Sequence, residues 1–447
     1  MKKLLFTAAI AIANITAYAQ HEHHEMPMPA KQQADTPAHH QHDMKDMANM
    51  SHAFSLQLPM NRNGSGTAWL PDASPMYGYM LHSRKWMYML HGNVFVRYNN
   101  QDVFNAGRRG AAKWDAPNWL MGMGQRKVGR NGLFRFSAML SLDAAIAGGS
   151  GYPLLFQTGE TWQDRPLIDR QHPHDLFSEL SIGYTQALSK KVDVFAYIGY
   201  PGEPALGSVA FMHRPSALPN PDAPLSHHWN DGTHITFGVA TLGVRYDKVK
   251  LEASSFTGRE PDEDRFNFDK PRFDSWSGRI SYNPTKEWSL QASHGYVKSP
   301  EVLHGNEDVN RTTASAIYSH RFSDKNFLNA TVLWGMNKTN GQDGEHAVLA
   351  EAAYAMNRVN VYGRYEWVQK SAEELALDET IYGHHDVYAV NALTLGAAYD
   401  MWQTKIVRVA GGAQASVYLP DEKLKTLYGS TPMAAQVYLR IYPSLMR

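Results

Sequence analysis

Apolar and polar side chains alternate with a period of two in one segment after another of this chain of 447 residues. Side chains of a β-strand point to opposite faces in turn, so the alternation predicts strands with one apolar and one polar face. In residues 86–98 the apolar positions are Trp86, Tyr88, Leu90, Val94, Val96 and Tyr98, opposite His91, Asn93 and Arg97. The pattern returns with Val359, Val361, Tyr365 and Trp367 opposite Asn360, Arg364 and Glu366, and with Val437, Leu439 and Ile441 opposite Gln436, Arg440 and Tyr442. An apolar face backed by a charged face suits a strand that separates lipid from a wet lumen.

About sixteen such strands are predicted, starting near residues 86, 116, 132, 175, 191, 234, 248, 272, 286, 309, 326, 346, 358, 387, 404 and 432. After every second strand the link is tight, as at residues 129–132, 247–248 and 357–358, whereas the intervening links are longer. Short turns at one end and long loops at the other are typical of an outer-membrane barrel. An even number of strands then places both termini on the short-turn side, in the periplasm.

The composition supports a barrel and excludes a helical membrane protein. The chain has 23 Tyr, 17 Phe and 11 Trp, a negative mean hydropathy and no apolar run long enough to span a bilayer as a helix. It has no Cys, so neither disulfides nor thiolate metal sites are available. The predicted fold is therefore all-β, a transmembrane antiparallel β-barrel of about 16 strands with two long inserted loops. A soluble sandwich or propeller is the alternative, and it would need polar outer faces.

The N-terminal region is predicted to precede the barrel in three parts. Lys2 and Lys3, the apolar run after them and a small-x-small cleavage pattern indicate a secretory signal peptide. The predicted organisation is a signal peptide at residues 1–19, a disordered His/Met-rich periplasmic tail at 20–52, an irregular lead-in at 53–85 and the barrel at 86–447. The formal charge of zero becomes −2 when the two lysines leave with the leader, which gives no reason to expect nucleic acid as a partner.

The tail carries the strongest chemical signal in the chain. It holds seven His and five Met in 33 residues, with almost no other large apolar side chain. Imidazole binds Cu²⁺ and Zn²⁺, and Met sulfur favours Cu⁺, so the mixture predicts a flexible segment that holds copper in either oxidation state. The tail residues predicted to bind metal are His21, His23, His24, Met26, Met28, His39, His40, His42, Met44 and Met47. The alternative is a polar export tail with an accidental enrichment in His.

Two islands of polar residues fall in the two longest predicted loops, residues 146–174 and 200–233. Loops this long are usually functional or disordered, and the large apolar residues among Gly and Pro favour loops folded over the mouth or into the lumen. Neutral imidazole with carboxylate suits Zn²⁺, Cu²⁺ or Ni²⁺. The loop residues predicted to bind metal are His172, His174, Asp175, His213, His227, His228, Asp231 and His234. No spacing among them matches a known metal motif such as H-E-x-x-H.

The same islands have a structural alternative and a catalytic one. Arg165, Arg170 and Arg214 would pair with the carboxylates, and the histidines would complete hydrogen-bond networks that hold the loops. Ser226 beside His227 is a weak candidate for a nucleophile with its base, because adjacent residues rarely face each other and no G-x-S-x-G elbow is present. We therefore predict no catalytic residues, no enzymatic activity and no tightly bound cofactor, with copper or zinc ions as ligands.

Several strings in the chain resemble a largely uncharacterised family of Gram-negative outer-membrane proteins. They include "LLFQTGETWQDRPLIDRQHPHDLF", "PLSHHWNDGTHITFGV" and "FTGREPDEDRF", and the resemblance extends from about Gly66 to the C-terminus. It implies an outer-membrane location and, more loosely, an association with metal resistance. The His/Met tail is similar in style to that of copper resistance protein B, also an outer-membrane barrel, although the barrel segments do not match that family.

These observations predict a channel or binding protein for copper or another transition metal in metal resistance, with the tail capturing the ion. Its expected location is the outer membrane of a Gram-negative bacterium. The expected partners are outer-membrane lipids, metal ions and periplasmic metal-resistance proteins. The alternatives are a general or substrate-specific porin and, with less support, an outer-membrane enzyme.

Overall fold

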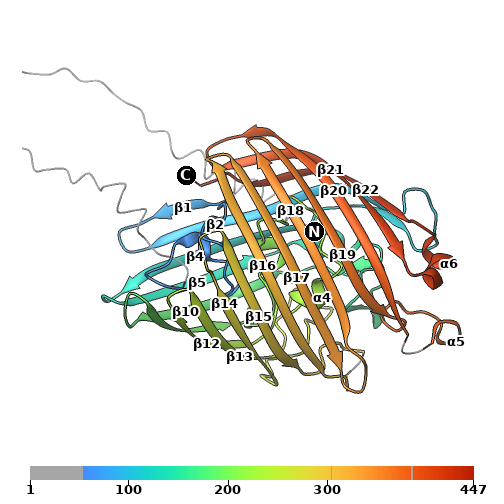
Figure 1. Cartoon of the computed structure of the whole chain (residues 1–447), viewed down its shortest axis with the longest axis horizontal. Coiled ribbons are helices and arrows are strands. Elements are labelled where there is room, and N and C mark those ends of the chain that lie inside the picture. Colours follow the sequence, from blue (N-terminus) through green and yellow to red (C-terminus); the bar gives the residue numbers. More distant parts are fainter. Residues whose placement is uncertain (1–53, 304, 384–385, 447) are drawn as a thin grey trace, which may run out of the picture. The chain divides into compact units, whose positions relative to one another are not determined.

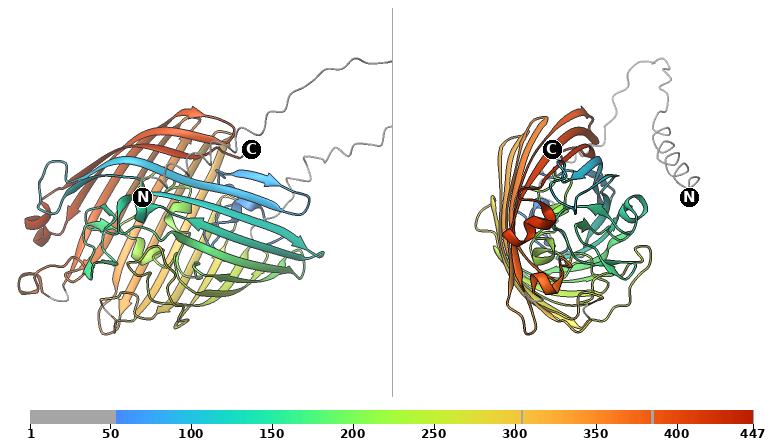
Figure 2. Two further views of the ribbon diagram at one scale, coloured as in Figure 1. Left: turned by 180° about the vertical axis from the view of Figure 1, so that it is seen from behind. Right: turned by 90° about the vertical axis from the view of Figure 1, so that its right-hand side faces the viewer.

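The structure is a computed structural model that describes residues 54–303, 305–383 and 386–446. In this part of the chain, sixteen antiparallel strands close into one barrel. Figures 1 and 2 show the strands running side by side around the wall. The barrel strands are β2 (Met87–Gln101), β4 (Asn118–Val128), β5 (Gly132–Leu140), β10 (Phe177–Ala187), β11 (Val192–Gly199), β12 (Val239–Tyr246), β13 (Val249–Phe256), β14 (Ser275–Tyr282), β15 (Trp288–Val297), β16 (Val309–Ser323), β17 (Asn326–Thr339), β18 (Glu345–Met356), β19 (Val359–Ser371), β20 (Val387–Gln403), β21 (Val407–Pro420) and β22 (Met433–Pro443). The predicted fold class and strand number are confirmed.

The barrel closes between its first and last strands. Val94 to Gln101 of β2 pair with Ile441 to Ala434 of β22 in antiparallel register. A closed barrel leaves no unpaired strand edge, which is the condition for a sheet in lipid. The earlier part of β2 pairs instead with the short strand β1 (Tyr79–His82).

Two predicted strand starts were wrong. The second strand begins at β3 (Ala111–Asp115) and continues as β4, because Pro117 has no N–H for the ladder and interrupts the strand. The sixth strand begins at Val239 rather than near 234, because Gly202 and Thr236 form a bridge at which the preceding loop leaves the wall.

The two faces of each strand follow the predicted alternation. On β2, Leu90 and Val96 are each 43% exposed on the outside, whereas Arg97 is fully buried in the lumen. The last strand repeats this arrangement, with Val437 exposed and Arg440 buried. The outside is thus an apolar belt, and the lumen carries the charged residues.

The lumen is filled by two long loops rather than left open. The loops occupy residues 141–176 and 200–238, close to the predicted ranges, and nearly all of residues 200–238 are buried. They contain the short elements α3 (Asp143–Ala147), β6 (Tyr152–Pro153), β7 (Thr161–Trp162), β8 (Arg165–Pro166), β9 (Arg170–Gln171), η2 (Phe211–His213) and α4 (His227–Asn230). Outside these loops lie η1 (Met60–Arg62), α5 (Glu379–Tyr382), η3 (Glu422–Leu424) and α6 (Lys425–Tyr428). Among the described residues, every helix is too short or too polar to cross a bilayer.

The described part of the lead-in also contacts lumen-facing side chains. Ser55 donates to Asp193 at 2.6 Å, and the carbonyls of Trp69 and Leu70 accept hydrogen bonds from Ser289 and Asn283 at 3.0 and 2.9 Å. The lead-in precedes β2, and β2 begins at the end of the barrel that carries the short turns. The lead-in therefore fills this half of the lumen. The predicted signal peptide and tail lie outside the described residues.

Candidate metal site in the barrel lumen

Helix α4 is held against the inner wall of the barrel by contacts to strands β19 and β17. The N–H and Oγ of Ser226 donate to Oε1 of Glu366 on β19, at 3.1 and 3.0 Å. The Lys370 ammonium of β19 lies 4.5 Å from the ring centre of the fully buried Trp229. Trp229 also lies so close to Gly335 of β17 that a Cβ at position 335 would clash with it. These contacts fix the position of the two histidines that begin the helix.

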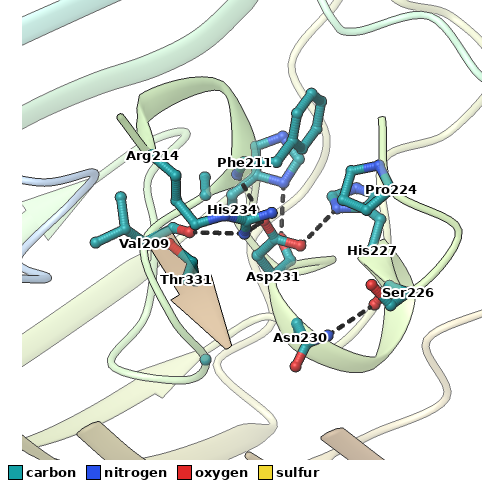
Figure 3. Close-up of polar contacts among 12 residues, drawn as sticks. Val209, Phe211, Arg214, Pro224, Ser226, His227, Asn230, Asp231, His234 and Thr331 are labelled. Carbon is teal, nitrogen blue, oxygen red and sulfur yellow. Dashed lines mark hydrogen bonds and ion pairs between the residues drawn. The ribbon is translucent and has the colours of Figure 1, made fainter. Parts of the chain in front are cut away.

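A buried ion-pair network anchors the same loop. The guanidinium of Arg214 donates to Glu351 of β18 at 2.8 Å and to Asp231 at 3.1 Å, and Arg364 of β19 donates to the second oxygen of Glu351 at 3.0 Å. Figure 3 shows Asp231 between Arg214 and His227. The predicted structural role of Arg214 therefore has a geometric basis, and the network also orients a histidine.

Three histidines from the two loops come together beside this network. One ring nitrogen from each of His172, His227 and His228 lies within 4.8 Å of the others. Their ring centres are 5.1 to 6.1 Å apart. Three imidazoles that bind one tetrahedral ion through bonds of about 2.0–2.1 Å have ring centres about 5 Å apart. Small rotations of the rings would therefore bring all three nitrogens onto one ion.

Each of these rings has a carboxylate at its Nδ1. Asp231 lies 2.9 Å from Nδ1 of His227, Glu160 lies 3.2 Å from that of His172, and Glu260 lies 3.4 Å from that of His228. The Nε2 atoms of His172 and His228 are buried and have no hydrogen-bond partner. A carboxylate on one imidazole nitrogen, with the other left free, is the arrangement that second-shell groups give to metal-binding histidines.

Two more histidines extend the cluster. His234 lies with its ring centre 4.9 Å from that of His227, and its Nδ1 is 2.8 Å from the carbonyl of Asp231. His174 lies 5.5 Å from His234, with Nδ1 2.7 Å from Asp143. Both have a buried Nε2 without a partner. The cluster therefore contains five imidazoles, of which three are close enough to share an ion.

Burial favours the neutral form of three histidines of the cluster. It lowers the pKa of His172, His227 and His234, and the neighbouring positive groups lower that of His172 further. Burial opposes ionisation of Asp231, but His227 and Arg214 outweigh it and hold its pKa below the usual range. Because metal binding requires neutral imidazole, His172 and His227 are in their ligand form at neutral pH.

The predicted residues of the two loops have different surroundings. Five of the predicted histidines form the cluster, and Asp231 supports it. Asp175 instead forms an ion pair with Arg265 at 3.3 Å, and His213 lies apart from the cluster, against Trp119 and His91. The ten tail residues from His21 to Met47 lie outside the described residues.

Three carboxylates of the cluster were absent from the predicted set. Glu160 and Asp143 come from the first loop, and Glu260 comes from the link between β13 and β14. Glu260 lies in an acidic run, but nothing in the sequence pairs that run with a histidine 32 positions earlier.

We expect His172 to make the stability of the metal-free protein depend on pH. In the unfolded chain an imidazole titrates near pH 6.5, whereas the pKa of buried His172 is far lower. Below about pH 6.5 only the unfolded chain takes up this proton, so the free energy of unfolding falls by about 1.4 kcal/mol for each unit by which the pH is lowered. His172→Gln removes this pH dependence. When the pH is lowered from 6.5 to 5.0, the free energy of unfolding of the variant, measured in urea, should rise by about 2 kcal/mol relative to that of the wild type.

Glu160, which contacts His172, acts in the opposite sense. Burial raises its pKa to about 8, so its contribution to stability is present at low pH and is lost as the pH rises through 8. Between pH 5.0 and 6.5 it is protonated in both folded proteins and cancels in the comparison. A stability difference between variant and wild type that stays constant from pH 7.5 to 5.0 would contradict the expectation.

The barrel and its loops define a class of protein. A closed antiparallel barrel of sixteen strands, with an apolar belt, short turns at one end and long loops at the other, is a porin-like barrel of the outer-membrane type. Over residues 225–413 the chain matches the model of a family described as putative beta-barrel porin-2, OmpL-like.

Solved porin structures resemble the chain in fold. A structure of Salmonella typhi OmpF in complex with daunomycin is 12% identical, with a TM-score of 0.52 over 81% of this chain and 100% of that one. An anion-selective porin from Comamonas acidovorans is 11% identical (TM-score 0.47; 80% and 100% covered), and Pseudomonas putida OprB is 12% identical (TM-score 0.48; 80% and 94% covered). No curated protein matches the chain. The likeness to OmpF supports the barrel fold, and the association with metal resistance stays a prediction.

Proposed function

We propose that this chain is an outer-membrane barrel, closed by its own loops, that binds a divalent transition-metal ion through His172, His227 and His228. The observation that carries the proposal is the convergence of three imidazoles, each with the carboxyl group of an Asp or Glu at its Nδ1. Imidazole nitrogen suits Cu²⁺ and Zn²⁺, and a site with three His leaves a fourth position for water or a passing ligand.

An acidic pocket gives cations a route to this site. It has a volume of about 60 Å³ and is lined by Glu160, Glu260, Glu301 and Glu374 among others. Glu160 and Glu260 are the same carboxylates that contact His172 and His228, so the pocket and the cluster are contiguous. Burial opposes ionisation of Glu260, but its hydrogen bond with His228 outweighs burial and holds its pKa below the usual range. An ionised carboxylate in a cleft raises the local concentration of cations.

Copper is the metal we favour, because of the chemistry of the predicted tail. Its imidazoles and thioethers would hold copper in either oxidation state at the periplasmic mouth, and the lumen site would be a second station. In this proposal the protein is a metal-binding component of the outer membrane that serves metal resistance together with periplasmic partners and without catalysing a reaction.

The proposal is tested by titrating the folded full-length protein with Co²⁺, whose visible absorption reports its ligands. We expect His227→Ala to weaken binding at the lumen site by about 100-fold or more, because the variant loses one of three bonds to the ion. His172→Ala and His228→Ala should act in the same direction. The tail contributes an equal background in every variant.

His294→Ala is the matched control, because His294 is exposed on the outer face of β15 and lies outside the cluster. It should leave the Co²⁺ titration unchanged. If the three cluster variants bind as much Co²⁺ as the control, with the same spectrum, the lumen site does not exist.

A porin is the second candidate, and the fold supports it. The OmpL-like family model and the OmpF structure are porin comparisons, and a sixteen-stranded barrel is wide enough for an aqueous channel. In this case the loops would form a movable plug, and the histidines would only hold it. Steady conductance of the full-length protein in planar bilayers, indifferent to Cu²⁺, would favour the porin.

A further inference from the structure

A second cavity lies in the other half of the lumen and is lined by sulfur. It has a volume of about 80 Å³, and four separate segments contribute Met60, Met76, Met89, Met123 and Met212 to its wall. A smaller cavity shares Met60, Met89 and Met123 and adds two more methionines. The described residues contain fourteen methionines in all, so half of them line these two adjoining spaces.

Two histidines complete the wall of the larger cavity. His91 of β2 and His213 of η2 have ring centres 5.6 Å apart, and Nε2 of His91 is buried without a hydrogen-bond partner. Two imidazoles on one ion have ring centres no more than about 6.4 Å apart, from bonds of about 2.1 Å. The spacing of His91 and His213 is within that limit.

Strand register places the sulfur atoms in neighbouring positions. Met89 on β2 lies directly opposite Met123 on β4, and His91 lies opposite Met121. Side chains opposite each other in an antiparallel pair have Cβ atoms about 4.5–5.5 Å apart. Met121 is in turn opposite Met139 of β5, and these two pack with Trp119 and Met212 in an apolar cluster beside the cavity without lining it. Barrel lumens of this kind are ordinarily polar, which makes this run of thioethers unusual.

The charges around the cavity select the kind of ion. Among the described residues that line either space there is no carboxylate. The guanidiniums present, Arg135 and Arg440, donate to the neutral amide oxygens of Asn63 and Asn93 at 3.0 and 2.9 Å, so they add positive charge to the wall and oppose a doubly charged ion more than a singly charged one. A divalent ion would have no anionic ligand here. A soft monovalent ion needs none, because neutral thioethers and imidazoles are the ligands it prefers.

Methionine also serves as a flexible filler of apolar cores, which is the ordinary reason for finding several together. A filler would close the space, whereas here the methionines surround cavities that stay open beside a buried, unpaired imidazole nitrogen. The polar side chains of Asn61 and Asn63 also reach the wall, so the space is not a purely apolar core.

We propose that this cavity, lined by methionines with His91 and His213, is a binding site for Cu⁺. It is separate from the cluster of His172, His227 and His228 and uses different chemistry, thioether and imidazole without carboxylate. Because β2 begins at this end of the barrel, the site lies in the half of the lumen with the short turns.

The test is an anaerobic titration of the folded full-length protein with Cu⁺, buffered by a chromophoric chelator that reports the number of ions bound. The combined variant Met89→Leu, Met123→Leu and Met212→Leu keeps the volume of the side chains and removes three sulfurs. We expect it to bind one Cu⁺ fewer per chain than the wild type. Equal numbers for the variant and the wild type would overturn the proposal.

The matched control is the combined variant Met336→Leu, Met356→Leu and Met401→Leu, whose methionines line neither space. It should bind as much Cu⁺ as the wild type, and a loss equal to that of the cavity variant would also overturn the proposal. His227→Ala separates the two sites, because it should lose Co²⁺ and keep the Cu⁺ of the cavity. If the wild type binds no Co²⁺ in the lumen, the proposed site of His172, His227 and His228 is contradicted. The loss of one Cu⁺ in the cavity variant would still support the methionine-lined site.

Discussion

Arg214→Ala is expected to destabilise the protein by about 3–5 kcal/mol, the usual cost of removing one partner of a buried ion pair. Arg214 is fully buried and compensates Glu351 on the wall and Asp231 on the loop. Its loss leaves one carboxylate unpaired in a dry lumen and releases the loop that carries His227. The urea midpoint in detergent measures the loss of stability, and the Co²⁺ titration should show weaker binding in the same variant.

Arg321→Ala is the matched control, because Arg321 pairs with Asp324 at an exposed turn. Exposed pairs of this kind contribute about 0–1 kcal/mol, so the midpoint should hardly move. If Arg214→Ala does not fold, Glu351→Gln offers a milder change, since it keeps a hydrogen-bond acceptor and removes only the charge between Arg214 and Arg364. Equal stability of Glu351→Gln, Arg214→Ala and the control would show that the network does not anchor the loop.

The barrel could be predicted because its determinants are local. A period of two needs only neighbouring residues, and every strand repeats it, as Val359, Val361 and Tyr365 do on one face of β19. The tight links could be predicted as well, because two to four residues between two strands can only form a turn to the neighbouring strand. Of the two errors, one occurred at Pro117, which interrupts a strand that resumes after it, and the other occurred where a distant contact decides the structure. The bridge between Gly202 and Thr236 delays β12, and only the folded loop brings those residues together.

The candidate site was only partly predictable, for the same reason. His227, His228 and Asp231 lie within one turn of chain, so their association was visible in the sequence. His172 joins them from 55 positions away, and Glu160 and Glu260 join from two different links. The methionine-lined cavity gave still less signal. Met89 and Met123 are ordinary residues on two alternating strands until register places them side by side on the inner wall.

Excision of the second long loop is expected to open the barrel. Gly202 and Thr236 exchange backbone hydrogen bonds of 3.0 and 2.9 Å, so residues 203–235 leave the wall and return to it at one ladder rung. An Asn-Gly turn can replace them, because two residues close an antiparallel hairpin. The excised protein loses α4 together with Arg214 and Ser226, the loop partners of Glu351 and Glu366, and these two carboxylates then face a solvated channel.

Planar-bilayer conductance measures the result. We expect little conductance from the full-length protein and a steady, porin-like conductance from the excised one, since sixteen strands enclose an aqueous channel when nothing fills it. The same Asn-Gly turn in place of the exposed link at residues 340–344 is the control and should leave the barrel closed. A full-length protein that conducts as well as the excised one would mean that the loop does not obstruct flow. An excised protein that stays closed would mean that residues 54–78 and 141–176 seal the lumen without it.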